Sequence, residues 1–294
     1  MKAKLLKLGL PKGSLQEATF RMFKKAGFDI SLPSVRSYFP SIDDPQIEPV
    51  LLRAQEMPRY VQDGALDCGI TGADWILENR AECVKVTDLI YAKQGLNKVR
   101  WVLAVPQDSG IKRISQLKGR RVATELVNVT KDYFRKNKVR VEVEFSWGAT
   151  EVKVSAGLVD AIVELTETGR SLKANKLEEI ATICESTTQF IANKDSYKDT
   201  WKRNKMDQIA VLLKGAIAAQ EKVGLKMNVR KQDLKKVLGR LPALKKPTIS
   251  GLSDSGWVAI ETIIDEKVVR VLIPELKKAG AQGIIEYPLN KVIY

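Results

Sequence analysis

The feature that most constrains the fold of this chain is a repeated order of apolar segment, glycine turn and amphipathic segment. Residues 2–10 have the pattern of a short strand, residues 11–14 form a Pro-Lys-Gly-Ser turn, and a helical pattern follows as far as Gly27. The order recurs at 58–74, where a buried strand at 65–70 separates two helical segments. Strands that alternate with helices are typical of α/β domains with a mostly parallel sheet.

The same order begins again near residue 99, which favours a second α/β lobe over one large sheet. Strand patterns at 99–105, 121–124 and 141–145 precede a further strand at 161–165. We therefore predict two α/β lobes around a cleft, like those of periplasmic binding proteins. The predicted lobes are residues 1–95 with 185–213, and residues 96–184.

A third block, residues 214–294, has a different order of elements. Its apolar and amphipathic segments follow one another as strand, helix, strand, strand, helix, strand, which is the ferredoxin-like arrangement. Pro242 and Pro247 stand between its segments, where turns are expected. We predict a separate C-terminal domain here.

Composition bounds the cellular setting. The chain has 294 residues, of which 44% are hydrophobic, enough for several packed cores. Its three cysteines form no CxxC pair, which argues against a disulfide framework or a zinc site. The first residues lack the pattern of a signal peptide, and no apolar run approaches the roughly 20 residues that span a bilayer. We expect a cytoplasmic protein with no membrane partner.

The chain contains no histidine, so its chemistry proceeds without the commonest general acid–base group and metal ligand. This excludes histidine-dependent hydrolase triads and most zinc enzymes. The formal net charge of +14 favours polyanionic partners, either nucleic acid or phosphorylated small molecules. Because no arginine-rich tail or aromatic–basic motif is present, we expect no nucleic-acid partner.

The segment VELTETGRSL, residues 163–172, concentrates polar groups where a strand pattern ends and a helical one begins. Such a junction directs backbone N–H groups and the positive end of the helix dipole at one point. Its glycine permits close approach of an anion, while hydroxyls and an arginine donate hydrogen bonds. We predict a phosphate monoester site; the alternative is a helix start capped by one hydroxyl. The predicted phosphate-binding residues are Thr166, Glu167, Thr168, Gly169, Arg170 and Ser171.

Two carboxylates precede this loop. Asp160 and Glu164 could accept hydrogen bonds from sugar hydroxyls or hold a hydrated Mg²⁺.

Several segments, in order along nearly the whole chain, resemble the long form of ATP phosphoribosyltransferase, the first enzyme of histidine biosynthesis. The segment at 148–180 is similar to that family's phosphoribosyl-diphosphate loop region, and LPKGSL at 10–15 to its N-terminal turn. The other similar segments are 53–79, 98–106 and, in the family's effector domain, 247–264.

The resemblance implies a reaction in which adenine N1 of ATP attacks C1 of phosphoribosyl diphosphate and displaces pyrophosphate, assisted by Mg²⁺. Positioning and electrostatics can stabilise such a sugar cation without histidine. By the resemblance, Asp160 and Glu164 are catalytic residues that face the ribose, and residues 166–171 hold the 5′-phosphate. Lys12 and Gly13 then suit the diphosphate. The residues expected toward ATP are Arg53, Asp74 and Arg100.

Each of these assignments has an alternative. Lys12 could be an ordinary turn lysine, and Asp74 could cap the helix at Trp75. Arg53 and Arg100 could pair with surface carboxylates. The role of Glu151, catalytic or supporting the loop, stays open.

The resemblance also implies regulation: the C-terminal domain binds histidine as a feedback inhibitor, and the chain forms a homo-oligomer between dimer and hexamer. The residues expected near the effector are Asn228, Thr248, Ile263 and Gly283. Gly251 and Arg230 stand where long-form relatives often carry proline, and Ser171 where they often carry threonine. The alternative function is a cytosolic solute-binding or sensor protein, because a two-lobed fold also serves that role.

Overall fold

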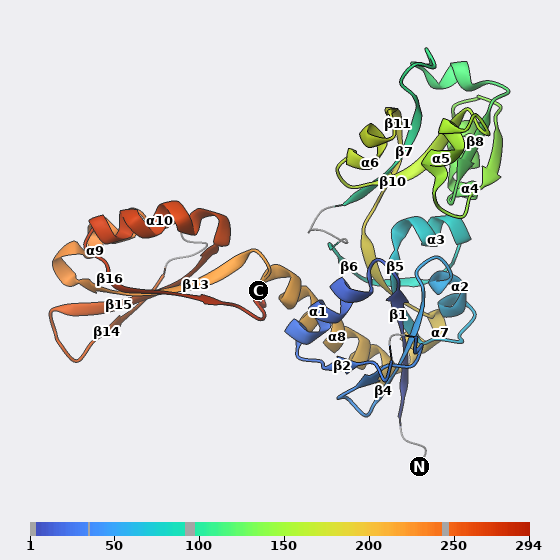
Figure 1. Cartoon of the computed structure of the whole chain (residues 1–294). Helices are drawn as coiled ribbons and strands as arrows, with labels where there is room; N and C mark the ends of the chain where they lie inside the picture. Colours follow the sequence, from blue (N-terminus) through green and yellow to red (C-terminus); the bar gives the residue numbers. More distant parts are fainter. Residues whose placement is uncertain (1–3, 35, 92–97, 243–246) are drawn as a thin grey trace. The chain divides into compact units, whose positions relative to one another are not determined.

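A computed structural model describes residues 4–34, 36–91, 98–242 and 247–294 (Figure 1). The chain divides into two compact units, Met1–Ala210 and Val211–Tyr294. The first unit contains two five-stranded sheets, each the centre of one lobe, and the second contains a four-stranded sheet. The predicted fold class, two α/β lobes and a C-terminal βαββαβ domain, is therefore confirmed.

The first lobe is built on a sheet with the order β4-β1-β5-β12-β6. Strand β1 runs parallel to β4 and β5, whereas β12 runs antiparallel to β5 and β6. Its elements are β1 (Leu6–Lys12), α1 (Gln16–Ala26), β2 (Ile30–Ser31), β3 (Ser41–Ile42), β4 (Ile47–Arg53), α2 (Met57–Gln62), β5 (Cys68–Gly72), α3 (Ala73–Asn79), β6 (Val84–Leu89), β12 (Thr188–Ala192) and α7 (Lys194–Lys198).

Strand β1 continues two residues further than its sequence pattern predicts. Pro11 and Lys12, expected in a turn, pair in register with Leu52 and Arg53 of β4. Pairing along one strand edge extends the ladder past the proline, and the turn begins only at Gly13, whose φ of 105° favours glycine.

The second lobe has the strand order β11-β7-β10-β8-β9. Strands β8, β9 and β10 are parallel, and β7 runs antiparallel to β10 and β11. Its elements are β7 (Val99–Pro106), η1 (Ile114–Leu117), β8 (Arg121–Thr124), α4 (Val127–Lys136), β9 (Glu142–Phe145), α5 (Thr150–Ser155), β10 (Ala161–Thr166), α6 (Arg170–Ala174) and β11 (Leu177–Ser186). Apolar side chains pack on both faces of this sheet, which explains the continuous apolar run of β7.

The second unit is an antiparallel sheet with the order β14-β15-β13-β16 and a core against α9 and α10. Helix α8 (Thr200–Ala218) precedes it, and the division between the units falls within this helix. Its other elements are β13 (Lys222–Arg230), η2 (Lys231–Asp233), α9 (Leu234–Leu238), β14 (Thr248–Gly251), β15 (Trp257–Asp265), α10 (Glu266–Lys278) and β16 (Gln282–Pro288). Among the described residues, no helix has the length and apolarity needed to cross a membrane.

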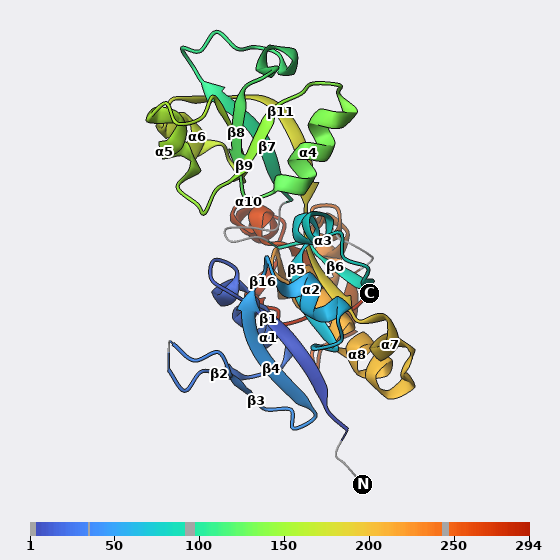
Figure 2. The same cartoon turned by 90° about the vertical axis from the view of Figure 1, so that its right-hand side faces the viewer.

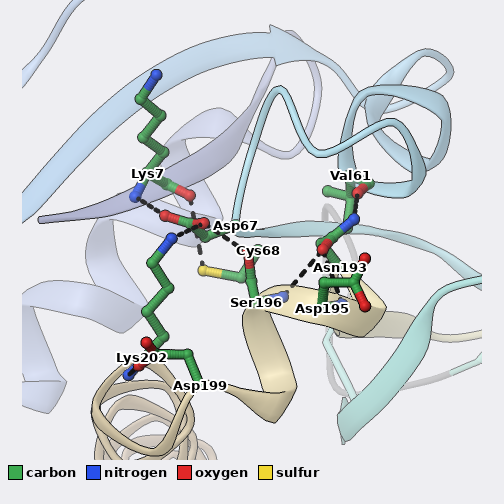
Figure 3. A network of polar contacts seen from close by, with 9 residues as sticks. All are labelled: Lys7, Val61, Asp67, Cys68, Asn193, Asp195, Ser196, Asp199 and Lys202. Atoms are coloured by element: carbon green, nitrogen blue, oxygen red, sulfur yellow. Dashed lines mark hydrogen bonds and ion pairs between the residues drawn. The ribbon is translucent and has the colours of Figure 1, made fainter.

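A polar network joins the start of the first sheet to the helices that end the first unit (Figure 3). The buried carboxylate of Asp67 accepts hydrogen bonds from the backbone N–H of Lys7 at 2.8 Å and from Ser196 Oγ and Lys202 Nζ at 2.6 Å each. Burial by itself would raise the pKa of Asp67, but these donors outweigh it, so the pKa is lowered.

Asn193 completes the network in Figure 3. Its side-chain oxygen accepts from two backbone N–H groups at the start of α7, and its amide donates to Val61 O and Gln62 O at 3.0 Å. The chain that returns from the second lobe is thereby fixed to α2 and β5 of the first.

We predict that Asp67→Asn lowers the free energy of unfolding by about 1.5–3 kcal/mol at neutral pH, the typical contribution of hydrogen bonds to a charged group. Urea denaturation measures this. The folded-state pKa lies below the unfolded value, so the stabilisation is present above the unfolded pKa and disappears as pH falls through the folded one. The matched control is Asp195→Asn, which removes an exposed pair with Lys198 and should leave stability unchanged. Equal losses in both variants would contradict the prediction.

Candidate functional site

A cavity of about 370 Å³ lies within the first unit, lined by residues of both lobes. The first lobe contributes residues at the carboxyl ends of β1, β4 and β5, and the second contributes residues that follow β8 and end β10. Ligands of open α/β sheets bind at such carboxyl ends. The residues of the predicted site that line the cavity are Lys12, Arg53, Asp74, Glu164 and Glu167.

The first lobe supplies positive charge to the cavity. Lys12 and Arg53 are register partners at the ends of the parallel strands β1 and β4, so their side chains lie next to each other. The ammonium of Lys12 donates to Ser37 O at 3.0 Å and lies 3.8 Å from the centre of the Tyr38 ring. Gly13 follows in a left-handed conformation. A Cβ atom added to Gly13 would lie 3.7 Å from Arg53 Nη1. The pair suits an anionic group with several oxygens.

Asp74 forms a buried wall of the cavity. Its Oδ2 accepts from the indole Nε1 of Trp101 at 2.7 Å, and its Oδ1 accepts from the backbone N–H of Trp75 at 3.0 Å. Burial raises the pKa of Asp74 more than these hydrogen bonds lower it. The carboxylate therefore contacts both the first turn of α3 and the second lobe, although the N-cap of α3 is Gly72 and not Asp74.

Glu164, on β10, is the titratable group of the cavity most relevant to chemistry. Burial raises its pKa to about 7, and the negative charges of Glu151 and Glu125 add to that effect. Its Oε1 accepts the backbone N–H of Leu165 at 3.1 Å. A carboxyl group with such a pKa changes its charge near neutral pH.

The polar loop between β10 and α6 is organised by its own side chains. Thr166 Oγ1 accepts the backbone N–H of Gly169 at 2.8 Å, and Gly169 takes a left-handed conformation with φ of 71°. Ser171 Oγ donates to Glu151 Oε1 at 2.9 Å, so Glu151 supports the loop. The Arg170 side chain is exposed and has no hydrogen-bond or ion-pair partner among the described residues. The Arg170 side chain is therefore available to an anion. Thr168, beside Gly169, is exposed and available in the same way.

The residues Gly13, Thr166, Thr168, Gly169, Arg170 and Ser171 lie close in the chain to residues of the cavity without lining it, whereas Asp160 and Arg100 form ion pairs away from it. Asp160 stands before the first residue of β10, four residues from Glu164 and hence about 13 Å away along the strand. Its carboxylate accepts from Arg120 Nη1 and from the backbone N–H of Arg121, both at 2.8 Å. Asp160 thus forms its pair at the opposite end of the strand from the cavity, and its contact with the ribose stays a prediction that this placement does not favour.

Arg100 forms the other of these ion pairs. It donates to both carboxylate oxygens of Glu179 on β11, at 2.5 and 3.1 Å, and to Thr182 Oγ1 at 3.2 Å. It does not line the cavity, whereas its neighbours Val99 and Trp101 do. Arg100 therefore forms the ion pair with a surface carboxylate that was the alternative to a position toward ATP.

Sequence reasoning missed Glu125, Tyr91 and Trp101, which also line the cavity. Glu125 follows the last residue of β8, so the rule that sites form at carboxyl ends of parallel strands could have found it. The hydroxyl of Tyr91 lies 2.7 Å from Thr19 Oγ1, and burial raises its pKa. No local signal in the sequence marks either aromatic residue as part of the cavity.

The fit to Mg²⁺ rests on carboxylates. Within the described ranges, no three His, Cys, Asp or Glu side chains are grouped for a metal ion held by protein alone. Mg²⁺ is usually bound by one or two carboxylates together with substrate phosphates. Burial is the main cause of the raised pKa of Glu164, and the negative charge of Glu151 adds to it; a cation would offset that charge. The residues present fit a cation shared with a phosphorylated substrate.

In the second unit, three of the four expected effector residues lie on the sheet face opposite the core. Asn228 pairs with Ala259, Thr248 with Glu261 and Ile263 with Gly224, and opposed residues of antiparallel strands share a face. The alternating residues of β13 and β15 form the core on the other face. Gly283 lies beside Asn228: a Cβ atom added to Gly283 would lie 3.7 Å from Asn228 Nδ2.

Comparison with known proteins agrees with this architecture. The family model described as ATP phosphoribosyltransferase matches residues 53–215, and that of the HisG C-terminal domain matches residues 219–291. The ATP phosphoribosyltransferase of Thermodesulfovibrio yellowstonii is 61% identical over 293 residues, covering 100% of both chains. That of Solibacter usitatus is 61% identical over 289 residues, covering 98% of this chain and 99% of its own.

A solved structure agrees as well. One chain of the ATP phosphoribosyl transferase (HisG:HisZ) complex from Thermotoga maritima superposes with a TM-score of 0.61 at 29% identity. The match covers 71% of this chain and 98% of that one. Matched by both family models and by full-length relatives at 61% identity, this chain belongs to the ATP phosphoribosyltransferase family.

Proposed function

We propose that the chain condenses ATP with 5-phosphoribosyl 1-diphosphate, through attack of adenine N1 on C1, to give phosphoribosyl-ATP and pyrophosphate. This is the first step of histidine biosynthesis. The observation that carries the proposal is family membership along the full chain. The cavity agrees with it, because a pair of cations and Glu167 of the loop at 166–171 line it. The family favours this enzyme over the solute-binding alternative.

The charges of the cavity suit a reaction that separates a sugar cation from a polyanion. Lys12 and Arg53 would hold the departing diphosphate from the first lobe. Glu164 and Glu125, from the second lobe, would stabilise positive charge at the ribose. The loop at 166–171 would bind the 5′-phosphate and so fix C1 between these groups.

Glu164 and Glu151 are the residues that would hold Mg²⁺, together with substrate oxygens. When bound, Mg²⁺ neutralises negative charge on the diphosphate and makes it a better leaving group.

We further propose cytoplasmic location, a homo-oligomer between dimer and hexamer, and histidine as a feedback inhibitor bound to the second unit. The open sheet face that carries Asn228, Thr248 and Ile263 supports the inhibitor proposal, because polar and apolar side chains stand together there. Inhibition requires histidine to bind the less active state more tightly than the active one.

The first prediction for this function is that purified protein with ATP, phosphoribosyl diphosphate and Mg²⁺ forms the adduct, detected by mass spectrometry with pyrophosphate removed enzymatically.

Arg170→Ala should weaken the binding of phosphoribosyl diphosphate by about tenfold or more and that of ATP little, because one charge-assisted hydrogen bond contributes roughly 1.5–3 kcal/mol.

The matched control for Arg170→Ala is Lys173→Ala, which removes the same charge from the same short helix. It should leave both affinities nearly unchanged. Absence of adduct from folded wild-type protein would refute the enzyme, and equal weakening of both substrates by Arg170→Ala would refute the phosphate role of the loop.

The second prediction concerns pH. Because the pKa of Glu164 is raised to about 7, the group is neutral below that pH and charged above it. Only the charged form stabilises a sugar cation, so kcat/KM for phosphoribosyl diphosphate should rise as pH increases through about 7. A Glu164→Gln variant should have low activity without this step. If the variant shows the same rise of kcat/KM with pH, the rise belongs to a group other than Glu164.

The third prediction is that calorimetric titration of the full chain detects histidine binding, accompanied by loss of activity. Thr248→Val keeps the shape of the side chain and removes its hydroxyl, so histidine should bind up to about tenfold more weakly. Activity without histidine should not change in this variant. If millimolar histidine neither binds nor inhibits the wild type, the regulatory proposal fails.

A further inference from the structure

Helix α3 belongs to the first lobe, yet it contacts the second lobe through two carboxylates. Asp74 and Glu78 are four residues apart, which places them on one face of the helix. Asp74 accepts from Trp101 of β7 at 2.7 Å, and Glu78 accepts from the start of α4. Figure 2 shows α3 and α4 as the helices of the two lobes that approach each other.

The start of α4 has no cap of its own. Leu126, its N-cap residue, offers no side-chain acceptor, and the first N–H groups of any helix need an acceptor outside the helix. Glu78 supplies it: Oε1 accepts the N–H of Asn128 and Oε2 that of Val129, each at 3.0 Å. The negative charge also meets the positive end of the helix dipole.

A third hydrogen bond, between a side chain of α4 and the backbone of α3, adds to this contact. Asn128 Nδ2 donates to the backbone oxygen of Glu78 at 2.9 Å. If the lobes moved apart, three hydrogen bonds would break together and the amides at the start of α4 would lose their acceptor. The contact therefore has one preferred separation of the lobes rather than a range of them.

Apart from the buried hydrogen bond between Asp74 and Trp101, two other side-chain contacts between the lobes nearby are weaker. Arg80 and Asp132 lie 3.4 Å apart, but their side chains are 62% and 48% exposed, so solvent screens the pair. Gln55 Nε2 and Glu125 Oε2 are 3.5 Å apart, at the outer limit of a hydrogen bond. Glu78 is half-buried and makes charge-assisted bonds, which are the stronger kind.

We propose that Glu78 is a positioning residue, which holds the lobes at the separation where both can bind one substrate. This inference rests on the proposed function. Lys12 and Arg53 are on one lobe and Glu164 on the other, so a ligand that needs all three depends on that separation. Glu78 does not line the cavity and so acts through the lobes alone.

The test is Glu78→Gln, which keeps the shape of the side chain, removes its charge and turns one acceptor into an NH₂ group facing an N–H. KM for both substrates should rise about fivefold, the factor expected from loss of a helix cap. At saturating substrate kcat should stay near the wild-type value, because bound substrate restores the closed arrangement. A purely structural role would lower kcat, through loss of folded enzyme, and leave KM unchanged.

Two further variants and one structural measurement complete the experiment. Arg80→Ala removes the exposed pair at the same interface and should change neither constant. Asn128→Ala removes only the hydrogen bond from Asn128 Nδ2 to the backbone oxygen of Glu78 and should raise both KM values by a smaller factor. Hydrogen exchange of the backbone amides at Asn128 and Val129 should be faster in Glu78→Gln than in Arg80→Ala.

If the wild type is active and Glu78→Gln has unchanged KM values, the positioning role of Glu78 is overturned and the proposed function is not. Equal effects of Arg80→Ala and Glu78→Gln would overturn that role as well. A wild type that forms no adduct would overturn the proposed function and this inference with it.

Discussion

Each half of the cavity is built on a different sheet, and this division governs what the site can do. Parallel strands of the first lobe end in Lys12 and Arg53, and those of the second end near Glu125 and Glu164. Cations therefore face carboxylates across one space. A substrate with a diphosphate beside a ribose that gains positive charge in the transition state matches such an array, because cations face the one and carboxylates the other. Contacts between the lobes, such as those of α3, then affect binding without touching the ligand.

The lack of histidine changes which groups can respond to pH. Burial and neighbouring carboxylates raise the pKa of Glu164 to about 7, so this carboxyl group titrates where an imidazole usually would. Asp74 is shifted in the same direction but is held by Trp101 and the start of α3. Asp67, by contrast, has a lowered pKa because its donors outweigh burial, and it stabilises the fold away from the cavity. Three carboxylates that are buried or half-buried thus have three roles, set by the balance of burial, hydrogen-bond donors and neighbouring charges.

The alternation of strands, turns and helices was readable from the sequence because periodicity and glycine positions are local signals. The polar loop was readable for the same reason, since its residues are consecutive. The sequence did not show that Asp160 lies away from the cavity, because two residues on one face of a strand can still lie at opposite ends of it. Arg100 depends on the pairing of β7 with β11, whose register is shifted by bulges that no local pattern specifies. Glu78 was missed because its partners are backbone amides 50 residues away.

The central claim is that both lobes bind one molecule of phosphoribosyl diphosphate in the cavity between them. A crystal structure with this substrate and Mg²⁺ tests it most directly. The account predicts the 5′-phosphate against the backbone amides and Arg170 of the loop at 166–171, with the diphosphate beside Lys12 and Arg53 of the opposite lobe. Density for the whole ligand on one lobe, or for the phosphate away from this loop, would contradict it.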